Sequence, residues 1–334
     1  MRAVVCRGYG GLDDAALETV PSPPLPDDGV RIAVHASCAS FASLLVMQGR
    51  HQNRADPPFT PGTEVAGVVL ETGPQAGLFR PGDRVIAAVR TGGYADEVAV
   101  PQQTVFALPD DVDFASGCQL PSVYGTAFAA LVWRANVRAG ETVLVHGAGG
   151  GSGLAAVEIA KVLGARVIAC AGSRAKLDVA AEHGADELID HRSQAVRERV
   201  LALTGGAGAN VAYDPVGGDA FRESLRCLCA EGRLVTMGFA SADIPQAPAN
   251  HLLVKNLDVI GVYWGHYLGW GRDPVSAQVQ MRVREAFATM FDWMAQGRLR
   301  PRVHACLPLA QFRAALEMIA AREVVGRVVL LPRA

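Results

Sequence analysis

The chain lacks an excess of charge of either sign. Its 334 residues include 31 lysines and arginines and 33 aspartates and glutamates, which gives a formal net charge of −2. There is no basic tail and no block of like charges, so we expect no nucleic-acid partner and no membrane surface held by bulk electrostatics. The first residues hold no apolar segment of signal-peptide length, and no apolar run approaches a membrane span. These absences predict a cytoplasmic protein.

A disulfide framework is also lacking. Seven cysteines, an odd number, are scattered along the chain, which fits reduced thiols better than paired ones. The one close pair, Cys227 and Cys229, falls in a helical pattern, where packing explains it better than a metal site. With 50% hydrophobic and 19% charged residues, the composition is that of a globular protein. The length allows two domains, each with its own core.

The first part of the chain consists of short strand signals. Up to about residue 115, apolar and β-branched runs alternate with Gly, Pro and Asp; they are VRIAVHASCAS, EVAGVVLETG, DRVIAAVR and YADEVAVP. The one helix expected here is short, near residues 41–48. This pattern predicts a small β-barrel.

From about Tyr124 strands and helices alternate. We expect strands at 142–146, 166–170, 187–190, 210–214, 233–238 and 258–263, and helices at 154–163, 175–183, 196–203 and 220–230. Gly164, Gly184 and Gly232 stand where helix C-terminal glycines are expected. This alternation predicts a doubly wound parallel sheet, an α/β fold. After Trp264 a long amphipathic helix, a strand signal and a second helix suggest that the chain returns to the first domain.

A glycine loop follows the first of these strands. The segment HGAGGGSG supplies the spacing A-x-G-x-x-G on Ala148, Gly150 and Gly153. Alone this is a weak signal, because glycine clusters are also ordinary loops. Between a strand and a helix, however, it is typical of dinucleotide binding, in which backbone N–H groups approach the pyrophosphate at the helix N-terminus.

The end of the next strand discriminates between cofactors. NAD sites place Asp or Glu there to hold the ribose 2′-hydroxyl, but Ala171 and Gly172 occupy these positions. Ser173, Arg174 and Lys176 follow and offer donors to a 2′-phosphate. The alternative is an ordinary helix start, with Ser173 as N-cap and Lys176 in solvent. The pattern favours NADPH.

Motifs along the whole chain resemble those of a known family. Nine motifs carry the resemblance, in order PGTEVAGVV, RPGDRV, GGYADEVAVP, YGTAFAAL, HGAGGGSG, AYDPVGG, GRLVTMGFAS, VIGVYWG and GRVVLLP. They resemble the medium-chain dehydrogenase/reductase superfamily and, within it, the zinc-free quinone oxidoreductase (zeta-crystallin-like) branch. The resemblance implies a GroES-like catalytic domain at 1–123 and 265–334 and a Rossmann NADPH-binding domain at 124–264, with the active site in the cleft.

The resemblance also implies roles for single residues, carried over by position. Thr126 would meet the nicotinamide carboxamide, although it could instead cap the helix that follows. The pyrophosphate and the nicotinamide ring would be lined by Gly150, Gly151, Ser152, Gly153, Gly238, Phe239, Ala240, Val262 and Trp264; Phe239 and Trp264 could also be plain core. Lys176 and His191 would contact the 2′-phosphate, and Arg322 would approach the cofactor across the cleft.

Zinc ligands are replaced at the positions where zinc-dependent relatives carry them. The family's Gly-His-Glu motif reads GTE here, so Thr63 stands at one ligand position, and Ser40 stands at that of the ligand cysteine. Cys38 lies two residues away, off the motif. A catalytic zinc needs Cys and His ligands from separate segments, so we expect no metal.

The expected substrate pocket departs from the family in its polar groups. Ser40 and Ser43 stand where relatives often carry Asn and Asp, and His51 replaces a tyrosine. These three are the candidate catalytic residues. His51 could donate a proton, because imidazole titrates near neutral pH, or could be an exposed loop histidine.

The leading hypothesis is therefore an NADPH-dependent reductase of quinones. The alternatives are reduction of an activated C=C bond in an enone, acrylate or enoyl-CoA, and an NADPH-binding protein with little catalysis. The apolar segment LDVIGVYW would leave a hydrophobic sheet edge exposed, which together with the family resemblance predicts a homodimer.

Overall fold

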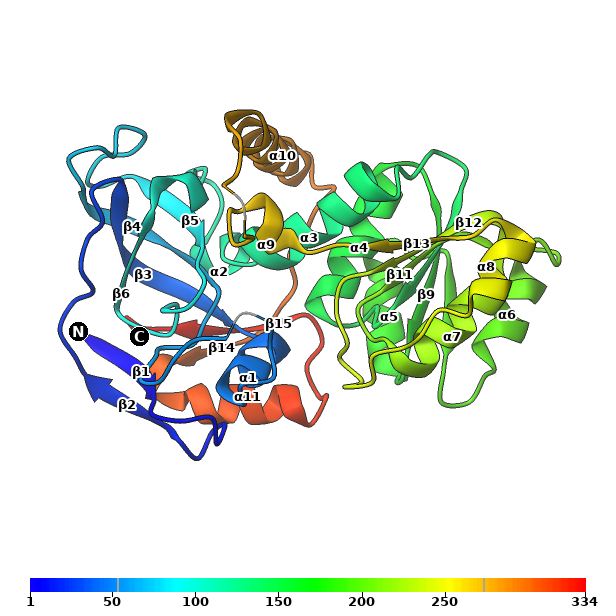
Figure 1. Cartoon of the computed structure of the whole chain (residues 1–334), viewed down its shortest axis with the longest axis horizontal. Helices are drawn as coiled ribbons and strands as arrows, with labels where there is room; N and C mark the ends of the chain where they lie inside the picture. Colours follow the sequence, from blue (N-terminus) through cyan, green and yellow to red (C-terminus); the bar gives the residue numbers. More distant parts are fainter. Residues whose placement is uncertain (53, 273) are drawn as a thin grey trace. The chain divides into compact units, whose positions relative to one another are not determined.

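The computed structural model describes residues 1–52, 54–272 and 274–334. The chain divides into two compact units (Figure 1). Unit 1 comprises Met1–Ser122, Gly265–Phe291 and Arg302–Ala334, and unit 2 comprises Val123–Trp264 and Asp292–Pro301. The expected domains differ from these units mainly in the segment Asp292–Pro301.

That segment belongs to unit 2 because of specific contacts there. The ring of Trp293 lies 5.6 Å from that of Phe128. Arg298 donates a hydrogen bond to the Val162 carbonyl (2.8 Å), and Arg300 donates one to the Glu182 carbonyl (2.6 Å). Hydropathy periodicity reveals a helix here but not which core it joins.

Unit 2 is built on a six-stranded parallel sheet in the order β10-β9-β8-β11-β12-β13. The strands are β8 (Thr142–His146), β9 (Arg166–Ala171), β10 (Glu187–Asp190), β11 (Ala209–Asp214), β12 (Leu228–Thr236) and β13 (Asp258–Gly261). This is the strand order of the Rossmann fold, in which the direction of winding reverses beside the first strand, here β8. Ligands bind such sheets at that reversal, outside the carboxyl ends of the strands.

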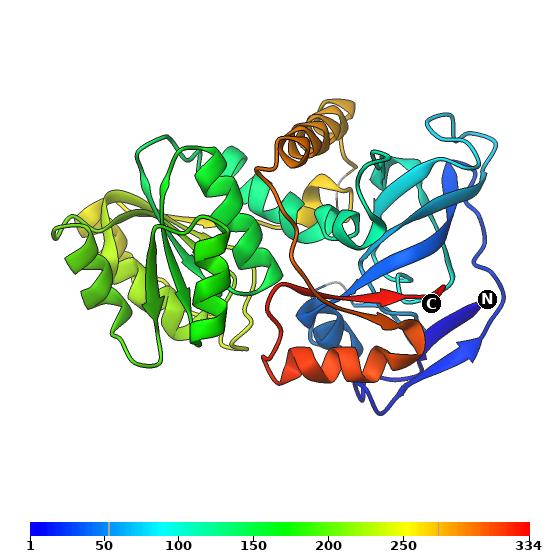
Figure 2. The same ribbon diagram turned by 180° about the vertical axis from the view of Figure 1, so that it is seen from behind.

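Helices cover both faces of this sheet (Figures 1 and 2). The helices of unit 2 are α3 (Gly125–Phe128), α4 (Gly151–Val162), α5 (Arg174–Glu182), α6 (Val196–Leu203), α7 (Gly218–Cys227) and α8 (Ala249–Lys255). Two π-helical turns, η2 (Leu120–Tyr124) and η3 (Ala129–Arg134), flank α3 in the sequence. Alternate strand residues face opposite sides. On one side Leu144, Ile168 and Leu234 pack against Phe221 and Leu225 of α7.

Two expectations from the sequence were wrong near the end of α7. The helix ends at Cys227, and β12 begins at Leu228, so Cys229 lies in a strand and not in a helix. Gly232 likewise lies within β12. Pairing of Ala209 with Leu228 extends the sheet earlier than helical periodicity predicts. Gly164 and Gly184, by contrast, follow α4 and α5 with φ of +80° and +105°, the left-handed conformation that ends helices.

Unit 1 contains a seven-stranded sheet and a two-stranded sheet. The larger has the order β14-β15-β3-β4-β5-β7, with β6 also paired to β3, and the smaller consists of β1 and β2. Their bounds are β1 (Arg2–Cys6), β2 (Ala15–Thr19), β3 (Gly29–Ala39), β4 (Glu64–Thr72), β5 (Arg84–Ala88), β6 (Glu97–Pro101), β7 (Val105–Ala107), β14 (Val303–Pro308) and β15 (Arg327–Leu331). β15 returns from the end of the chain to pair with β3, as the sequence led us to expect of the tail.

Within the described residues, unit 1 contains one long helix and several shorter ones. They are α1 (Phe41–Met47), α2 (Phe114–Gly117), α9 (Trp264–Tyr267), α11 (Phe312–Ala320), the 3-10 turns η1 (Gln102–Thr104) and η4 (Leu309–Gln311), and the long α10 (Ala277–Ala295), which continues into unit 2. α1 and α11 share a core with β1 and β15 through Leu44, Met47, Leu316 and Val328. In the part of the chain that the structure describes, no helix is long and apolar enough to cross a membrane.

A buried carboxylate ties together the segments of unit 2. Glu158 of α4 is 1% exposed. It accepts hydrogen bonds from the Tyr124 hydroxyl (2.7 Å), from Nδ1 of His183 (2.7 Å) and from the Arg300 backbone N–H (3.0 Å). Burial and the Glu158 charge raise the pKa of Tyr124 well above its usual range, so its hydroxyl stays a donor. Tyr124 directly precedes α3, so this hydrogen bond anchors the start of the helix that carries Thr126.

We predict that Glu158→Ala destabilises unit 2. The substitution leaves a buried hydroxyl, an imidazole and an N–H group without their acceptor, which costs about 3 kcal/mol of the free energy of unfolding. Urea unfolding measures this loss. Glu182→Gln, which removes an exposed carboxylate in the same unit, is the control and should change stability by less than about 0.5 kcal/mol. Equal losses in the two variants would contradict the role of Glu158.

Candidate functional site

The glycine loop joins β8 to α4 with little space for side chains. A Cβ on Gly153 would lie 2.2 Å from the Gly147 carbonyl oxygen, and one on Gly149 would lie 2.4 Å from Cβ of Lys176. Either distance is far inside van der Waals contact. At Gly150, in contrast, the nearest atom to such a Cβ is 3.5 Å away. Gly149 and Gly153 are thus required by packing, whereas the backbone at Gly150 is open to a ligand.

The N-terminus of α4 has the properties of an anion site. Gly150 is its N-cap residue, and no side chain caps the first turn, which contains Gly151, Ser152 and Gly153. The first N–H groups of a helix have no acceptor within the helix, and the helix dipole favours negative charge there. The geometry fits a pyrophosphate.

Ser152 is held by a residue that the sequence did not single out. Its hydroxyl lies 2.6 Å from the hydroxyl of Tyr213 in β11. Tyr213 is fully buried, and burial raises its pKa well above the usual range. The contact fixes the first turn of α4 to the neighbouring strand. Nothing in the motif AYDPVGG distinguishes this tyrosine from a core residue.

At the end of β9 the helix-start alternative is partly correct. Ser173 is the N-cap of α5, and its hydroxyl accepts a hydrogen bond from the Lys176 backbone N–H (3.4 Å). Arg174 pairs with Asp178 one turn later, at 2.7 Å, with 82% of its side chain exposed. Exposed pairs of this kind contribute little to stability, so Arg174 can exchange its partner for an anion.

Gly172 lies beside the side chains of His191 and Arg192. A Cβ at this position would be 2.8 Å from Nε2 of His191 and 3.2 Å from Nε of Arg192. Lys176 packs against Gly149 on the loop side. The end of β9 therefore combines a missing side chain with His191, Arg192 and Lys176, as a 2′-phosphate requires. Arg192 was missed in the sequence; its signal is its place directly after His191 at the end of the next strand.

The residues expected around the nicotinamide follow β12 and β13. Gly238, Phe239 and Ala240 form the turn after β12, in which the Ala240 N–H donates to the Pro215 carbonyl (3.1 Å). Phe239 is 36% exposed, whereas Val262 and Trp264 are 7% and 6% exposed. The Trp264 ring lies against α3, where a Cβ on Gly125 would approach it to 2.6 Å.

Thr126 does not cap a helix. It lies inside α3, whose N-cap is Tyr124 without a side-chain hydrogen bond, and its side chain is half-buried. Trp264 has the burial of a core residue, and Phe239 does not.

In unit 1 two of the three candidate catalytic residues lie together. Ser40 is the N-cap of α1, and its hydroxyl accepts from the Ser43 backbone N–H (3.0 Å). The two hydroxyls are 2.8 Å apart, and the Tyr94 hydroxyl donates to that of Ser43 (2.9 Å). Ser43 is fully buried. This network accounts for both serines as structural groups, and Tyr94 in GGYADE is the partner that sequence reasoning missed.

The remaining candidates of unit 1 lie in turns. His51 follows α1 and is half-buried. Arg322 follows α11, is exposed, and adopts a left-handed φ of +59°. Thr63 stands where zinc-dependent relatives carry a zinc ligand. It precedes Glu64, which forms an ion pair with Arg327. Among residues 1–52, 54–272 and 274–334, no group of three or more His, Cys, Asp or Glu side chains could hold a metal ion.

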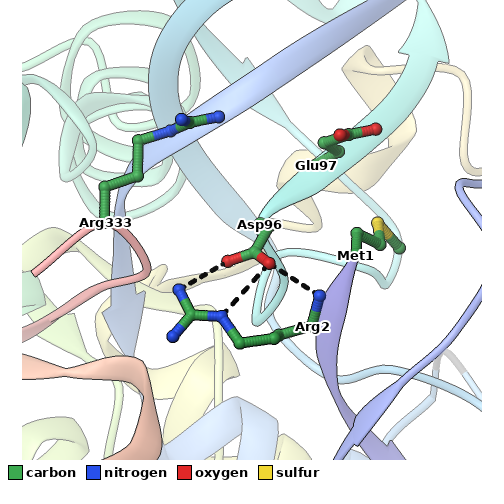
Figure 3. Close-up of a pocket in the computed structure, with 5 residues that line it drawn as sticks. All are labelled: Met1, Arg2, Asp96, Glu97 and Arg333. Atoms are coloured by element: carbon green, nitrogen blue, oxygen red, sulfur yellow. Dashed lines mark hydrogen bonds and ion pairs between the residues drawn. The ribbon is translucent and has the colours of Figure 1, made fainter.

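A separate hollow in unit 1 carries none of the predicted site residues. It has a volume of about 430 Å³ and is lined by Met1, Arg2, Asp96, Glu97 and Arg333 (Figure 3). Asp96 accepts hydrogen bonds from the backbone N–H (2.6 Å) and from Nη2 (3.0 Å) of Arg2. Partial burial raises the pKa of Asp96, but these bonds outweigh it and lower the pKa overall. Arg2 and Asp96 thus pair with each other across this hollow.

Family models match both parts of the chain. Residues 26–110 match the alcohol dehydrogenase GroES-like domain, and residues 151–288 match the zinc-binding dehydrogenase domain. Quinone oxidoreductase-like protein 2 homolog of Nematostella vectensis is 38% identical over 98% of this chain and 88% of its own length. Quinone oxidoreductase of Pongo abelii is 30% identical over 99% of this chain and 98% of its own.

A solved structure is similar to this chain over its whole length. Quinone oxidoreductase of Escherichia coli, complexed with NADPH, superposes with a TM-score of 0.90 at 25% identity and covers 99% of this chain and 100% of its own. The expected fold class, a GroES-like domain with a Rossmann-type parallel sheet, is confirmed. The chain belongs to the quinone oxidoreductase branch of the medium-chain dehydrogenase/reductase superfamily.

Proposed function

We propose that this chain is a reductase that uses NADPH to transfer hydride to a quinone, without a metal. One observation carries the choice of cofactor: at the end of β9, Gly172 lies beside His191 and Arg192, and Lys176 of α5 packs against Gly149 of the glycine loop. A carboxylate, which would select NADH by binding the ribose 2′-hydroxyl, is missing there. The NADPH in the Escherichia coli relative supports the same choice.

The residues of unit 2 bind and orient the cofactor. When bound, NADPH supplies the hydride. N–H groups at the start of α4 hold the pyrophosphate, and Lys176 and Arg192 hold the 2′-phosphate through charge-assisted hydrogen bonds. Thr126 orients the carboxamide, with Glu158 and Tyr124 fixing α3. Phe239, Val262 and Trp264 exclude water from the ring.

Quinone reduction fits a pocket without a strong acid. The oxyanions of a reduced quinone are stabilised by delocalisation and can take protons from solvent. Reduction of an enone or enoyl thioester gives a more basic enolate, for which a positioned donor contributes about 10²–10⁴-fold. In this chain serines stand where relatives often carry Asn and Asp, and both serine hydroxyls are engaged in the Tyr94 network. His51 remains the candidate donor.

We predict that NADPH binds at least tenfold more tightly than NADH, a difference of about 1.4 kcal/mol. Lys176→Ala and Arg192→Ala should each weaken NADPH and leave NADH nearly unchanged, because only the 2′-phosphate contacts are lost. Fluorescence titration with both nucleotides measures this. Arg199→Ala removes an exposed positive charge of α6 and is the control, which should alter neither affinity. Equal affinity of the unmutated chain for NADPH and NADH would refute the proposed cofactor.

The substrate is tested by NADPH oxidation against a panel of quinones, enones and enoyl thioesters. We expect turnover with a quinone and the same rate after exhaustive chelation, because Thr63 and Ser40 occupy the ligand positions. His51→Ala and Ser43→Ala should each change quinone turnover by less than about tenfold. Ser43→Ala should instead lower the free energy of unfolding by about 1 kcal/mol, since Tyr94 loses an acceptor.

Other outcomes of this panel would select another function. Activity on enones alone, lost in His51→Ala, would identify a C=C reductase. Tight NADPH binding without turnover of any acceptor would identify a binding protein. Activity abolished by chelation and restored by zinc would show that the pocket holds a metal.

We also propose a homodimer that forms at β13. This strand ends the six-stranded sheet, and the adjacent helix α8 has no buried residue. Leu253 and Val254 of α8 are 78% and 82% exposed. Adjacent apolar side chains of this kind mark contact surfaces, and an unpaired edge strand is a template for a second copy.

Light scattering at micromolar concentration should therefore give twice the 35.1 kDa chain mass. The pair of substitutions Leu253→Asp and Val254→Asp should shift the mass toward one chain, because charges would be buried in the interface. Leu78→Asp alters a 56% exposed leucine of unit 1 and should leave the dimer intact. A monomeric unmutated chain would contradict the proposal.

A further inference from the structure

Two cysteine thiols of unit 1 are in contact in its interior. Cys38 lies near the end of β3, and Cys118 is the C-cap residue of α2. Both are 0% exposed, and their sulfur atoms are 3.2 Å apart. A disulfide has an S–S distance of about 2.05 Å. The two sulfurs therefore need to approach by only about 1 Å to form a bond.

The contact is set by the packing of secondary-structure elements. Cys38 is paired in the sheet with Val329 of β15. Cys118 is held at the end of α2 by its backbone N–H, which donates to the Phe114 carbonyl (2.9 Å), and its sulfur lies 3.3 Å from the Ala115 carbonyl oxygen. Cys38 lies within a strand, and Cys118 begins the turn directly after α2 and is held there by these bonds. The proximity is thus a property of the folded unit.

The two thiols differ in acidity. Burial raises the pKa of Cys38, but the hydrogen bond with Cys118 and the charge of Arg327 in β15 outweigh it and lower the pKa to about 7. Burial and the neighbouring Cys38 raise the pKa of Cys118 well above its usual range. Cys38 is therefore the more acidic thiol of the pair and the one that ionises first. The thiolate is the nucleophilic form of cysteine.

A third cysteine provides an internal comparison. Cys306 of β14 is exposed, and the sheet register places it in the row Cys306–Val329–Cys38. It is two strands away from Cys38, about 10 Å, whereas a disulfide needs Cα atoms within about 7 Å. Cys306 is thus more accessible than the buried pair but cannot bond to Cys38. If Cys38 and Cys118 are oxidised in preference to the exposed Cys306, the cause is the short distance between their sulfur atoms and not their accessibility.

We propose that Cys38 and Cys118 are a modification site at which hydrogen peroxide forms a reversible intramolecular disulfide. The Cys38 thiolate attacks one oxygen of the peroxide; an S–O bond forms, the O–O bond breaks, and the departing hydroxide takes a proton from solvent and becomes water. Cys118 then attacks the Cys38 sulfur; the S–S bond forms, the S–O bond breaks, and the second oxygen leaves as water with the proton that Cys118 gives up. Two thiols are oxidised by two electrons and one peroxide is reduced to two waters. A dithiol reductant reverses the reaction by exchange.

The disulfide would act on the neighbourhood of the serine network. The Cys38 carbonyl accepts a hydrogen bond from the Tyr94 hydroxyl (3.2 Å), which also donates to Ser43. Cys38 is two residues before Ser40, the N-cap of α1. A covalent link from β3 to α2 therefore restrains the strand end that carries these groups. The inference stands on unit 1 alone and does not depend on the proposed substrate.

The experiment uses the full-length chain, reduced with dithiothreitol, desalted and treated with hydrogen peroxide. After denaturation and alkylation, intact mass should show five alkylated cysteines in place of seven, because the disulfide consumes two of the seven thiols. Peptide mapping should recover a peptide containing Cys38 joined to one containing Cys118. Dithiothreitol should restore seven alkylated cysteines.

Three variants separate the pair from general oxidation. Cys306→Ser should still give the linked peptide. Cys118→Ser should abolish it and leave Cys38 as a sulfenic acid that dimedone traps, and Cys38→Ser should abolish both products. The mapping of the unmutated chain holds even if a variant fails to fold. Oxidation confined to Cys306, or a link between Cys306 residues of two chains with Cys38 and Cys118 still alkylated, would overturn the proposal.

Discussion

The close approach of α4 to the end of β8 governs the arrangement of the proposed nucleotide site. A Cβ on Gly153 would lie 2.2 Å from the Gly147 carbonyl oxygen, so this contact exists only because the side chain is absent. It brings the free N–H groups of the helix to the carboxyl edge of the sheet. Gly149 makes a similar contact with Lys176, which connects the loop to the end of β9. Two hydrogen bonds then fix α4: one joins Ser152 to Tyr213 of the sheet, and the other joins Glu158 to Tyr124, which precedes α3.

At this edge of the sheet, the absence of a carboxylate at Gly172 matters as much as the side chains that lie around it. Gly172 carries no side chain and lies beside His191 and Arg192, which come from the end of the next strand. Because β9 and β10 run parallel, their carboxyl ends meet, and groups separated along the chain become neighbours. A histidine and an arginine at the end of a single strand would by themselves be ordinary surface residues. Their convergence on a position without a carboxylate is what suits a phosphate group.

Polar groups in unit 1 are engaged with each other to an extent that their sequence positions do not suggest. The hydroxyls of Ser40 and Ser43 are hydrogen-bonded to each other. Ser40 also caps the N-terminus of α1, and Ser43 accepts a hydrogen bond from the Tyr94 hydroxyl. Buried hydroxyls are costly unless they are paired, so this network stabilises the end of β3 and the start of α1. Cys38 joins the same region through its carbonyl and meets Cys118 through its sulfur. The end of β3 thus combines a hydroxyl network with a pair of thiols of unequal acidity.

The sequence by itself determined the alternation of strands and helices, the glycine loop, the missing acid after β9 and the family, because these depend on local spacing and on residues that backbone geometry requires. It placed α6 at Val196–Leu203 but extended α7 beyond Cys227, since helical periodicity does not show where a strand finds its partner. Arg192, Tyr213, Tyr94 and the contact of Cys38 with Cys118 were decided only by the tertiary structure. Each depends on elements distant in the chain that packing brings together, and no local pattern encodes that proximity.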